Sequence, residues 1–236
     1  MNFQFTSFPK LIYFAYKNTN LSRNEFISRW KQHGYLGISL PRWKNIYKYS
    51  QCIALKKSIS VKNNIIKCNG VAVVFYNSEK SRIDHISDKA SSSIMKTDEQ
   101  ITFSKMVRDC SILTNEHLIV TEKNLKFTYK IFFCFWKKKY NLNKFIFKQW
   151  CIYINNSLVK FLKKKISKFE LKFNYLRPNY PHPKKFENCI IIAELSINKI
   201  DQINTFLNQI LLNSHLMALL EKIDIIITKE NELYKS

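Results

Sequence analysis

Glycine and proline are scarce in this sequence, with three glycines and five prolines among 236 residues. Their scarcity excludes collagen-like chains, flexible linkers and the glycine-rich loops that cradle phosphates. Long apolar runs are missing too: the longest, such as residues 11–16 and 131–136, reach about a third of the ~20 residues that a membrane-spanning helix needs. Residues 1–10 lack the features of a secretory signal. We therefore expect a soluble, cytoplasmic protein with no membrane partner.

Metal-binding and cofactor-binding patterns are also missing. The six cysteines include no Cys-x-x-Cys pair, and the five histidines are scattered without ligand-like spacing. The sequence contains no dinucleotide fingerprint, no phosphate-binding loop and no nucleophile elbow. We expect reduced thiols, no metal and no cofactor.

Basic residues outnumber acidic ones by 39 to 17, which gives a formal charge of +22. Such an excess is typical of proteins that bind nucleic acids or anionic membrane surfaces. Here Lys, Asn, Ile, Phe and Tyr are over-used together, while Gly, Pro and Ala are scarce. All five favoured residues have codons made of A and T alone. We therefore attribute most of the charge to genome composition, and a true binding patch stays open as an alternative.

The chain contains one pattern of elements twice. Residues 10–17 and 130–137 are apolar runs of strand length with a lysine at each end, and a helical pattern follows each of them. Trp30 and Trp150 occupy the same offset in the two helices. The other predicted strands are 45–56, 70–76, 116–121, 169–176, 189–195 and 224–228, and short extra helices are predicted at 97–106, opened by a Thr97/Gln100 capping box, and at 214–222.

The resulting order, β-α-β-β-α-β, is that of the ferredoxin-like unit. Both first strands are apolar on both faces, so each sheet needs cover on both sides. We predict the α+β class, with two ferredoxin-like βαββαβ units, residues 1–123 and 124–236, packed sheet to sheet as an intrachain dimeric α+β barrel. Residues 121–126 are the predicted joint. The chain would then be a monomeric pseudo-dimer or a homodimer.

One segment resembles a known family. Ser22 and Glu25 form a capping box, and Phe26, Trp30 and His33 follow at helical spacing. Together with the Gly-Val-Ala opening of residues 70–78, this run resembles the EthD-domain proteins of the dimeric α+β-barrel superfamily. The resemblance covers roughly residues 10–122.

The sequence departs from the family pattern at the helix histidine. His33 comes one position earlier after Trp30, and Gly34-Tyr35 follows it where many relatives carry a small residue and then proline. The second half has Tyr153 where His33 would fall. We therefore expect one competent pocket and one eroded pocket.

His33 is the candidate catalytic residue. It lies in the apolar stripe of its helix, and a buried imidazole suits general acid–base catalysis on a hydrophobic substrate. The resemblance implies such a role in some relatives, whose barrel cavities bind aromatic or polyketide-like compounds. The alternative is a core histidine hydrogen-bonded to a backbone carbonyl.

Tyr47, Tyr49 and Gln51 share one face of the predicted second strand. If they face the barrel, they would bind a polar substituent of a flat ligand, and if they face the helices, they are ordinary packing. Trp30 is a further candidate for substrate binding, or else part of the helix–sheet core. The group of Asp84, His85 and Asp88 is predicted to lie on a solvated helix face.

We predict a cofactor-independent enzyme that acts on a small hydrophobic, aromatic or polyketide-like molecule in the barrel cavity by cyclisation, dehydration or decarboxylation. One alternative is a non-enzymatic binding or carrier protein on the same scaffold, or a structural protein whose cavity is filled. A basic nucleic-acid binder ranks last, because no Lys/Arg-Gly-Phe RNA motif is present.

Overall fold

The computed structural model describes residues 8–55, 59–61, 66–120, 126–137, 156, 159–160, 162–164, 166, 168–177, 180–200 and 220–235. Its strands are β1 (Pro9–Ala15), β2 (Ile46–Ala54), β3 (Ile59–Val61), β4 (Gly70–Tyr76), β5 (Ser111–Val120), β6 (Tyr129–Lys137), β7 (Glu170–Leu176), β8 (Cys189–Ile197) and β9 (Leu220–Lys235). Its helices are α1 (Arg23–Ser39), α2 (Glu79–Ser87) and α3 (Lys89–Thr102), with 3-10 turns η1 (Pro41–Asn45), η2 (Val107–Cys110) and η3 (Lys184–Phe186).

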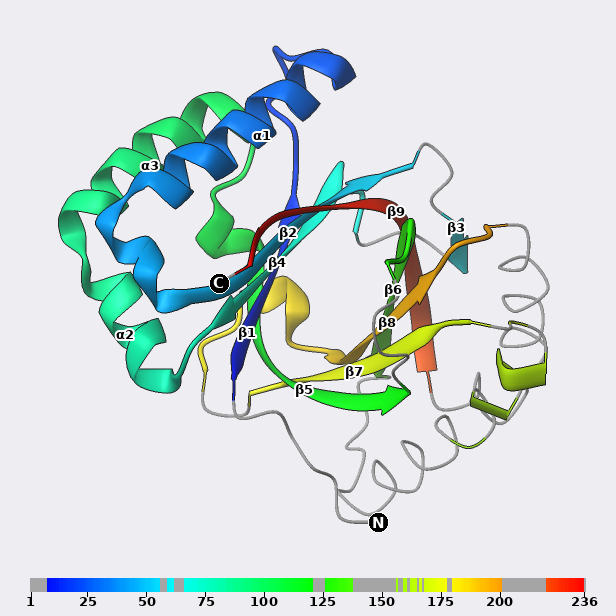
Figure 1. Ribbon diagram of the computed structural model, residues 1–236. Coiled ribbons are helices and arrows are strands. Elements are labelled where there is room, and N and C mark those ends of the chain that lie inside the picture. The colour runs from blue at the N-terminus through cyan, green and yellow to red at the C-terminus, as the bar shows by residue number, and fades with distance from the viewer. Residues whose placement is uncertain are drawn as a thin grey trace.

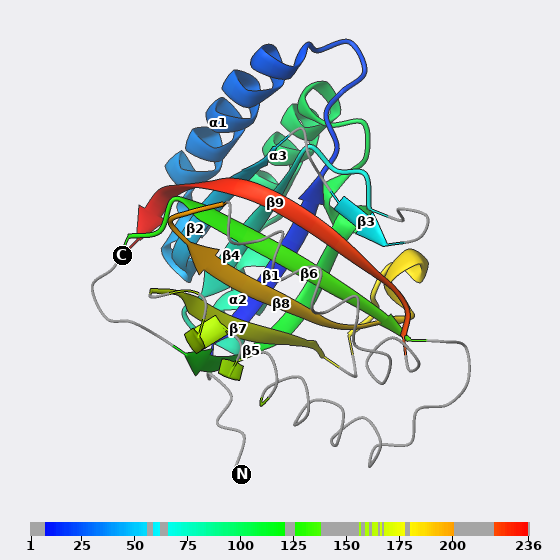
Figure 2. The same cartoon turned by 90° about the vertical axis from the view of Figure 1, so that its right-hand side faces the viewer.

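Eight antiparallel strands form a closed barrel (Figure 1). The hydrogen-bonded order around it is β2-β4-β1-β5-β7-β8-β6-β9, and the pairing of β9 with β2 closes the ring. The closing register runs from Lys48 opposite Lys235 to Ala54 opposite Thr228. β9 extends across the whole wall (Figure 2), and β3 pairs with its first part. The two halves of the chain therefore share one continuous wall.

Each half contributes four strands in the same relative order. The orders are β2-β4-β1-β5 and β7-β8-β6-β9, so in both halves the first strand lies between the third and the fourth. The three α-helices cover the outer face of the first half (Figure 1). The second helix of the predicted β-α-β-β-α-β order in the second half falls after residue 200 and lies outside the described residues. Residues 121–125 of the predicted joint lie outside them as well. Of the helix expected near 147–161, residues 156 and 159–160 are described and are helical.

Buried apolar side chains form three layers, because alternate strand residues face the barrel interior and the outer side. The interior layer draws on both halves and includes Ile12, Phe14, Phe132 and Trp136. In the outer layer of the first half, side chains of α1 pack on the sheet. The second half has its own outer layer on β6 to β9.

A buried ionic network continues the interior layer. Lys10 Nζ lies 2.6 Å from Glu116 Oε2 and 2.5 Å from Glu194 Oε1, and Lys130 Nζ lies 2.7 Å from Glu230 Oε1. Burial alone would raise the pKa of Glu116, but the neighbouring ammonium groups, Lys10 foremost, hold it below its ordinary value. Paired charges and apolar side chains thus occupy the described interior, which is where the sequence led us to expect a ligand cavity.

Local predictions are confirmed at the start of α1. Ser22 Oγ accepts a hydrogen bond from the Glu25 amide at 3.3 Å, and Glu25 Oε2 accepts one from the Ser22 amide at 2.6 Å. The predicted helix start at Thr97 is wrong, because Thr97 lies inside α3, whose N-cap is Asp88. The short helix predicted at 214–222 is wrong over its last three residues, which begin β9.

The described cysteines, Cys52, Cys68, Cys110, Cys134 and Cys189, are all free, as expected. Burial raises the pKa of the Cys52 and Cys68 thiols to about 12, so both stay protonated at neutral pH. In the described part of the chain, no helix has the length and apolarity needed to cross a membrane.

Replacing Lys10 tests the ionic network. Lys10→Met should lower the free energy of unfolding by about 3–5 kcal/mol, because Glu116 and Glu194 would stay buried without their nearest cation, and Lys172 and Lys130 lie farther away, at 3.8 and 4.0 Å. Lys48→Met is the matched control: it removes the more exposed ion pair with Glu232 and should cost at most about 1 kcal/mol. Denaturation in urea measures both values. Equal losses in the two variants would contradict a buried network.

Candidate functional site

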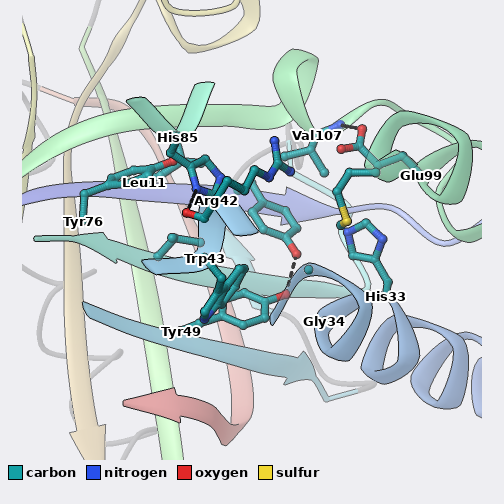
Figure 3. A pocket seen from close by; sticks show the side chains of 14 residues that line it. Leu11, His33, Gly34, Arg42, Trp43, Tyr49, Tyr76, His85, Glu99 and Val107 are labelled. Carbon is teal, nitrogen blue, oxygen red and sulfur yellow. Dashed lines mark hydrogen bonds between the residues drawn. The ribbon is translucent and has the colours of Figure 1, made fainter. Parts of the chain in front are cut away.

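Two adjoining cavities lie between the outer face of the first-half sheet and α1, α3 and η1. The inner chamber has a volume of about 90 Å³ and is lined by Tyr13, His33, Trp43 and Tyr49, among others (Figure 3). The vestibule has a volume of about 470 Å³ and extends past α2 to Arg108. The residues that line both are Leu11, Arg42, Tyr76, His85, Met95, Glu99 and Val107.

All three glycines of the chain permit close contacts around the inner chamber. A Cβ atom on Gly34 would lie 2.8 Å from Gln51 Nε2, and one on Gly37 would lie 3.1 Å from the Trp43 ring. A Cβ atom on Gly70 would lie 2.3 Å from the Trp30 ring. Real Cβ atoms do not approach within 3.0 Å, so a side chain at Gly34 or Gly70 would displace its neighbours. At Gly37 the Trp43 ring of η1 would have to give by a few tenths of an ångström.

His33 and Asp98 form a buried pair at the end of the inner chamber. His33 Nδ1 on α1 lies 2.6 Å from Asp98 Oδ2 on α3, and Arg29 donates to the other carboxylate oxygen. Burial alone would raise the pKa of Asp98, but the hydrogen bonds from His33 and Arg29 hold it below its ordinary value. The carboxylate therefore orients the imidazole through Nδ1. The other ring nitrogen, Nε2, has no hydrogen-bond partner among the described residues.

Two tyrosine hydroxyls meet in the inner chamber within a network rich in donors. The Tyr13 and Tyr49 hydroxyls lie 3.0 Å apart (Figure 3). Trp30 Nε1 donates to Tyr13 at 3.0 Å, and Gln51 Nε2 donates to Tyr49 at 2.9 Å. Indole and amide N–H groups can only donate.

Counting donors shows that this network needs one more acceptor. One tyrosine hydroxyl donates to the other, so its hydrogen is used, and the second hydroxyl has a hydrogen with no acceptor among the described residues. Burial raises the pKa of Tyr49 to about 12 and holds that of Tyr13 well above its ordinary value, so both remain protonated donors at neutral pH. An oxygen atom of a ligand in the chamber would complete the network.

The structure places the predicted site residues unequally. His33 and Tyr49 line the inner chamber. Trp30 and Gln51 stand behind Tyr49 in the hydrogen-bond network, and Gln51 Nε2 also donates to the Trp30 carbonyl at 2.7 Å. Tyr47 is separated from Tyr49 by a register shift in β2 and stacks on Phe8, with ring centroids 5.9 Å apart.

The pocket lies outside the barrel rather than inside it. Tyr49 and Gln51 face the helices rather than the barrel. This is the orientation for which the sequence predicted ordinary packing. Both described cavities lie on the outer side of the sheet, whereas the described side chains that point into the barrel pack against one another. The barrel cavity expected from the sequence stays a prediction.

His85 corrects a second prediction. It lies on the buried side of α2, where its ring packs edge-on against Tyr76 at 5.4 Å and its Nδ1 lies 3.2 Å from the Arg42 carbonyl oxygen. Asp84 is exposed as expected, whereas Asp88 caps α3 by accepting from the Ser91 amide.

The sequence reasoning also missed several pocket residues. Tyr13, Arg42, Asp98 and Glu99 come from three separate elements, β1, η1 and α3, and no spacing in the sequence links them to His33. Tyr13 had a usable signal, since it alternates with Ile12 and Phe14 in a strand that needs cover on both faces. Among the described residues, no group of three or more His, Cys, Asp or Glu side chains could hold a metal ion.

No family model matches the sequence. No curated protein matches it either.

Solved structures resemble the chain in fold over nearly its whole length. A putative monooxygenase from Fusobacterium nucleatum subsp. nucleatum is 11% identical, with a TM-score of 0.53 and 97% of each chain covered. A mutant chlorite dismutase from Candidatus Nitrospira defluvii is 8% identical, with a TM-score of 0.58 over 96% of this chain and 92% of that one. An anthrone oxidase-like protein is 8% identical, with a TM-score of 0.58 over 96% of this chain and 94% of that one. The chain therefore shares the fold of these proteins.

The burial of His85 predicts a pH dependence of stability. Burial, reinforced by Arg42, lowers the pKa of His85 to about 4, whereas an unfolded histidine titrates near 6.5. Between these values the unfolded chain binds the extra proton, so stability is complete above about pH 6.5 and falls toward pH 4. Between pH 7 and pH 5 this contribution should fall by about 2 kcal/mol.

His85→Gln removes the titrating group and isolates its effect. Urea denaturation of both proteins at pH 7 and pH 5 should show a smaller loss in the variant. If both proteins lose the same free energy of unfolding, His85 is not the buried neutral imidazole described above.

Proposed function

We propose that this chain is a cofactor-independent enzyme that binds a small hydrophobic, oxygenated aromatic molecule in the two cavities and transfers a proton on it. One observation carries the proposal: a carboxylate-oriented imidazole and a hydroxyl donor without an acceptor line the same buried chamber. The solved proteins of this fold described as monooxygenases, chlorite dismutase and anthrone oxidase-like support small-molecule chemistry on the scaffold.

The sizes of the cavities suggest how such a molecule would lie. An apolar cavity of ~150 Å³ accommodates benzene, so an inner chamber of about 90 Å³ has room for a substituent rather than a ring. The vestibule, at about 470 Å³, falls within the range of about 300–1,000 Å³ typical of ligand sites. The ring system would therefore occupy the vestibule, and one oxygen-bearing substituent would enter the inner chamber.

The proposed chemistry is proton abstraction next to a carbonyl. His33 Nε2 takes the proton from carbon, and the electron pair of the broken C–H bond moves into the carbonyl to give an enolate oxygen. Asp98 stabilises the resulting imidazolium, and the spare tyrosine hydroxyl donates to the enolate oxygen. The imidazolium then returns the proton. Cyclisation and dehydration can both proceed through such an enolate.

We also propose that the two halves are copies of one EthD-like, ferredoxin-like unit, with the boundary between residues 123 and 124. Lys10 and Lys130 begin equivalent strands, and each accepts a hydrogen bond at its carbonyl from a threonine, Thr114 or Thr228. Two residues after each threonine comes the glutamate that binds the lysine, Glu116 or Glu230. This repeated set of contacts supports duplication independently of strand order.

Deuterium exchange tests the enzyme directly. The protein should accelerate exchange of the acetyl protons of 6-acetyl-2-naphthol in D₂O, followed by NMR. His33→Gln should slow the exchange by a factor of about 10² to 10⁴, the usual contribution of a general base. Ligand binding without accelerated exchange would contradict the enzyme and favour a carrier protein.

A double variant tests the hydroxyl donor. Tyr13→Phe combined with Tyr49→Phe should abolish the preference for 2-naphthol over naphthalene, because no hydroxyl remains to meet the ligand oxygen. Tyr47→Phe, which removes a hydroxyl outside both cavities, should keep the preference. Calorimetric titration measures it, and an unchanged preference in the double variant would exclude these hydroxyls from binding.

A further inference from the structure

Arg42 lies at the junction of the inner chamber and the vestibule. It follows Pro41 at the start of η1 and lines both cavities. Figure 3 shows its side chain extending from beside His85 toward Val107. A molecule that extends from the vestibule into the inner chamber can therefore contact its side chain.

One nitrogen of the Arg42 guanidinium donates a hydrogen bond, and the other two have no partner among the described residues. Nη1 donates to Ser92 Oγ at 2.9 Å. Nε is buried without a hydrogen-bond partner, and Nη2 has none among the described residues. The Nε–Nη2 edge is one of the two edges with which arginine binds a carboxylate through two parallel hydrogen bonds.

No carboxylate of the described residues forms an ion pair with Arg42, although the charges of Asp88 and Glu99 act on it from farther away. Within the described residues, no carboxylate lies within 4.0 Å of Arg42, whereas the neighbouring Arg82 is paired with Glu79. Glu99, which lines both cavities, instead accepts a hydrogen bond from the Val107 amide at 3.0 Å, and burial raises the pKa of its carboxyl group. Arg42 is half-buried, and a partly buried charge without an ion pair favours an anion beside it.

The surroundings add to the preference for an anion. Arg82, Lys96 and Arg108 also line the vestibule, and Glu99 is the carboxylate among the lining residues. The walls near Arg42 are aromatic and aliphatic, namely Leu11, Tyr76 and Met95. A ring would pack against these walls while an attached carboxylate reached the guanidinium.

We infer that Arg42 anchors the ligand of this pocket through a carboxylate, and that the substrate class is therefore an aromatic carboxylic acid. This inference rests on the proposed function, since it names the molecule that the two cavities bind. The carboxylate lies at the chamber junction as a recognition group, and Ser92 holds the guanidinium in position.

Calorimetric titration with a matched pair of probes tests the inference. The wild-type protein should bind 6-hydroxy-2-naphthoic acid at least about tenfold more tightly than its primary carboxamide, because only the acid pairs with the charge. Arg42→Gln should reduce this ratio to about threefold or less. Lys44→Gln is the control: it removes one positive charge from the same 3-10 turn at an exposed position outside both cavities, and it should preserve the ratio.

Ser92→Ala provides a second variant in case Arg42→Gln does not fold, which circular dichroism would show. It keeps the charge but frees Nη1, and it should weaken the acid about threefold while leaving the carboxamide unchanged. Equal binding of acid and carboxamide by the wild-type protein would overturn the role of Arg42 and leave the aromatic pocket standing. If 2-naphthol, the acid and the carboxamide all fail to bind, the proposed function fails, and this inference fails with it.

Discussion

The pairing of β2 with β9 closes the barrel, and this closure determines where the protein can bind a ligand. It joins the two halves into one wall and leaves no free sheet face between them. The described residues that point inside are apolar and aromatic side chains and the ion pairs of Lys10 and Lys130. The outer layer, where helices rest on the sheet, is left for binding.

Two glycines and one tryptophan determine how closely α1 packs on the outer face of the first-half sheet. Gly70 admits the Trp30 ring, and Gly34 brings α1 close to Gln51, so the backbone of α1 lies near the sheet at these two points. The inner chamber adjoins this contact, since Gly34 and Gly37 of α1 line it together with residues of η1 and α3. The same packing positions the tyrosine hydroxyls. Trp30 donates a hydrogen bond to Tyr13, and Gln51 donates one to Tyr49.

Two charged groups have different roles in this account. Both carboxylate oxygens of Asp98 have hydrogen-bond partners, His33 and Arg29, so Asp98 orients the imidazole without attracting a further cation. Arg42 is unsaturated, so its charge is available to a ligand. A neutral His85 beside it adds an aromatic surface without competing for the anion.

Much of the fold could be predicted from the sequence, because its signals are local. The strands follow apolar runs, and α1 follows the capping box of Ser22 and the stripe through Phe26, Trp30 and His33. The site could be predicted only in part. Asp98 is 65 residues from His33, and a pairing between two helices leaves no trace in the spacing of either.

The errors have physical reasons as well. α2 is short and carries exposed Ile83 and Ile86, so the apolar pattern does not identify the side on which His85 is buried. The register shift in β2 displaces Tyr47 from the face that alternation assigns to it. Lysines at the ends of apolar strands normally mark the point where a strand reaches solvent, whereas Lys10 and Lys130 turn inward to partners on other strands.

The central claim is that ligands bind between the helices and the outer face of the first-half sheet. The imidazole signals of the histidines, followed by NMR during titration with 6-acetyl-2-naphthol, test it most directly. The account predicts that the signals of His33 and His85, which line the cavities, shift with the bound fraction, while the signal of His117 on β5 does not. Binding detected by calorimetry with both cavity histidines unmoved would contradict it.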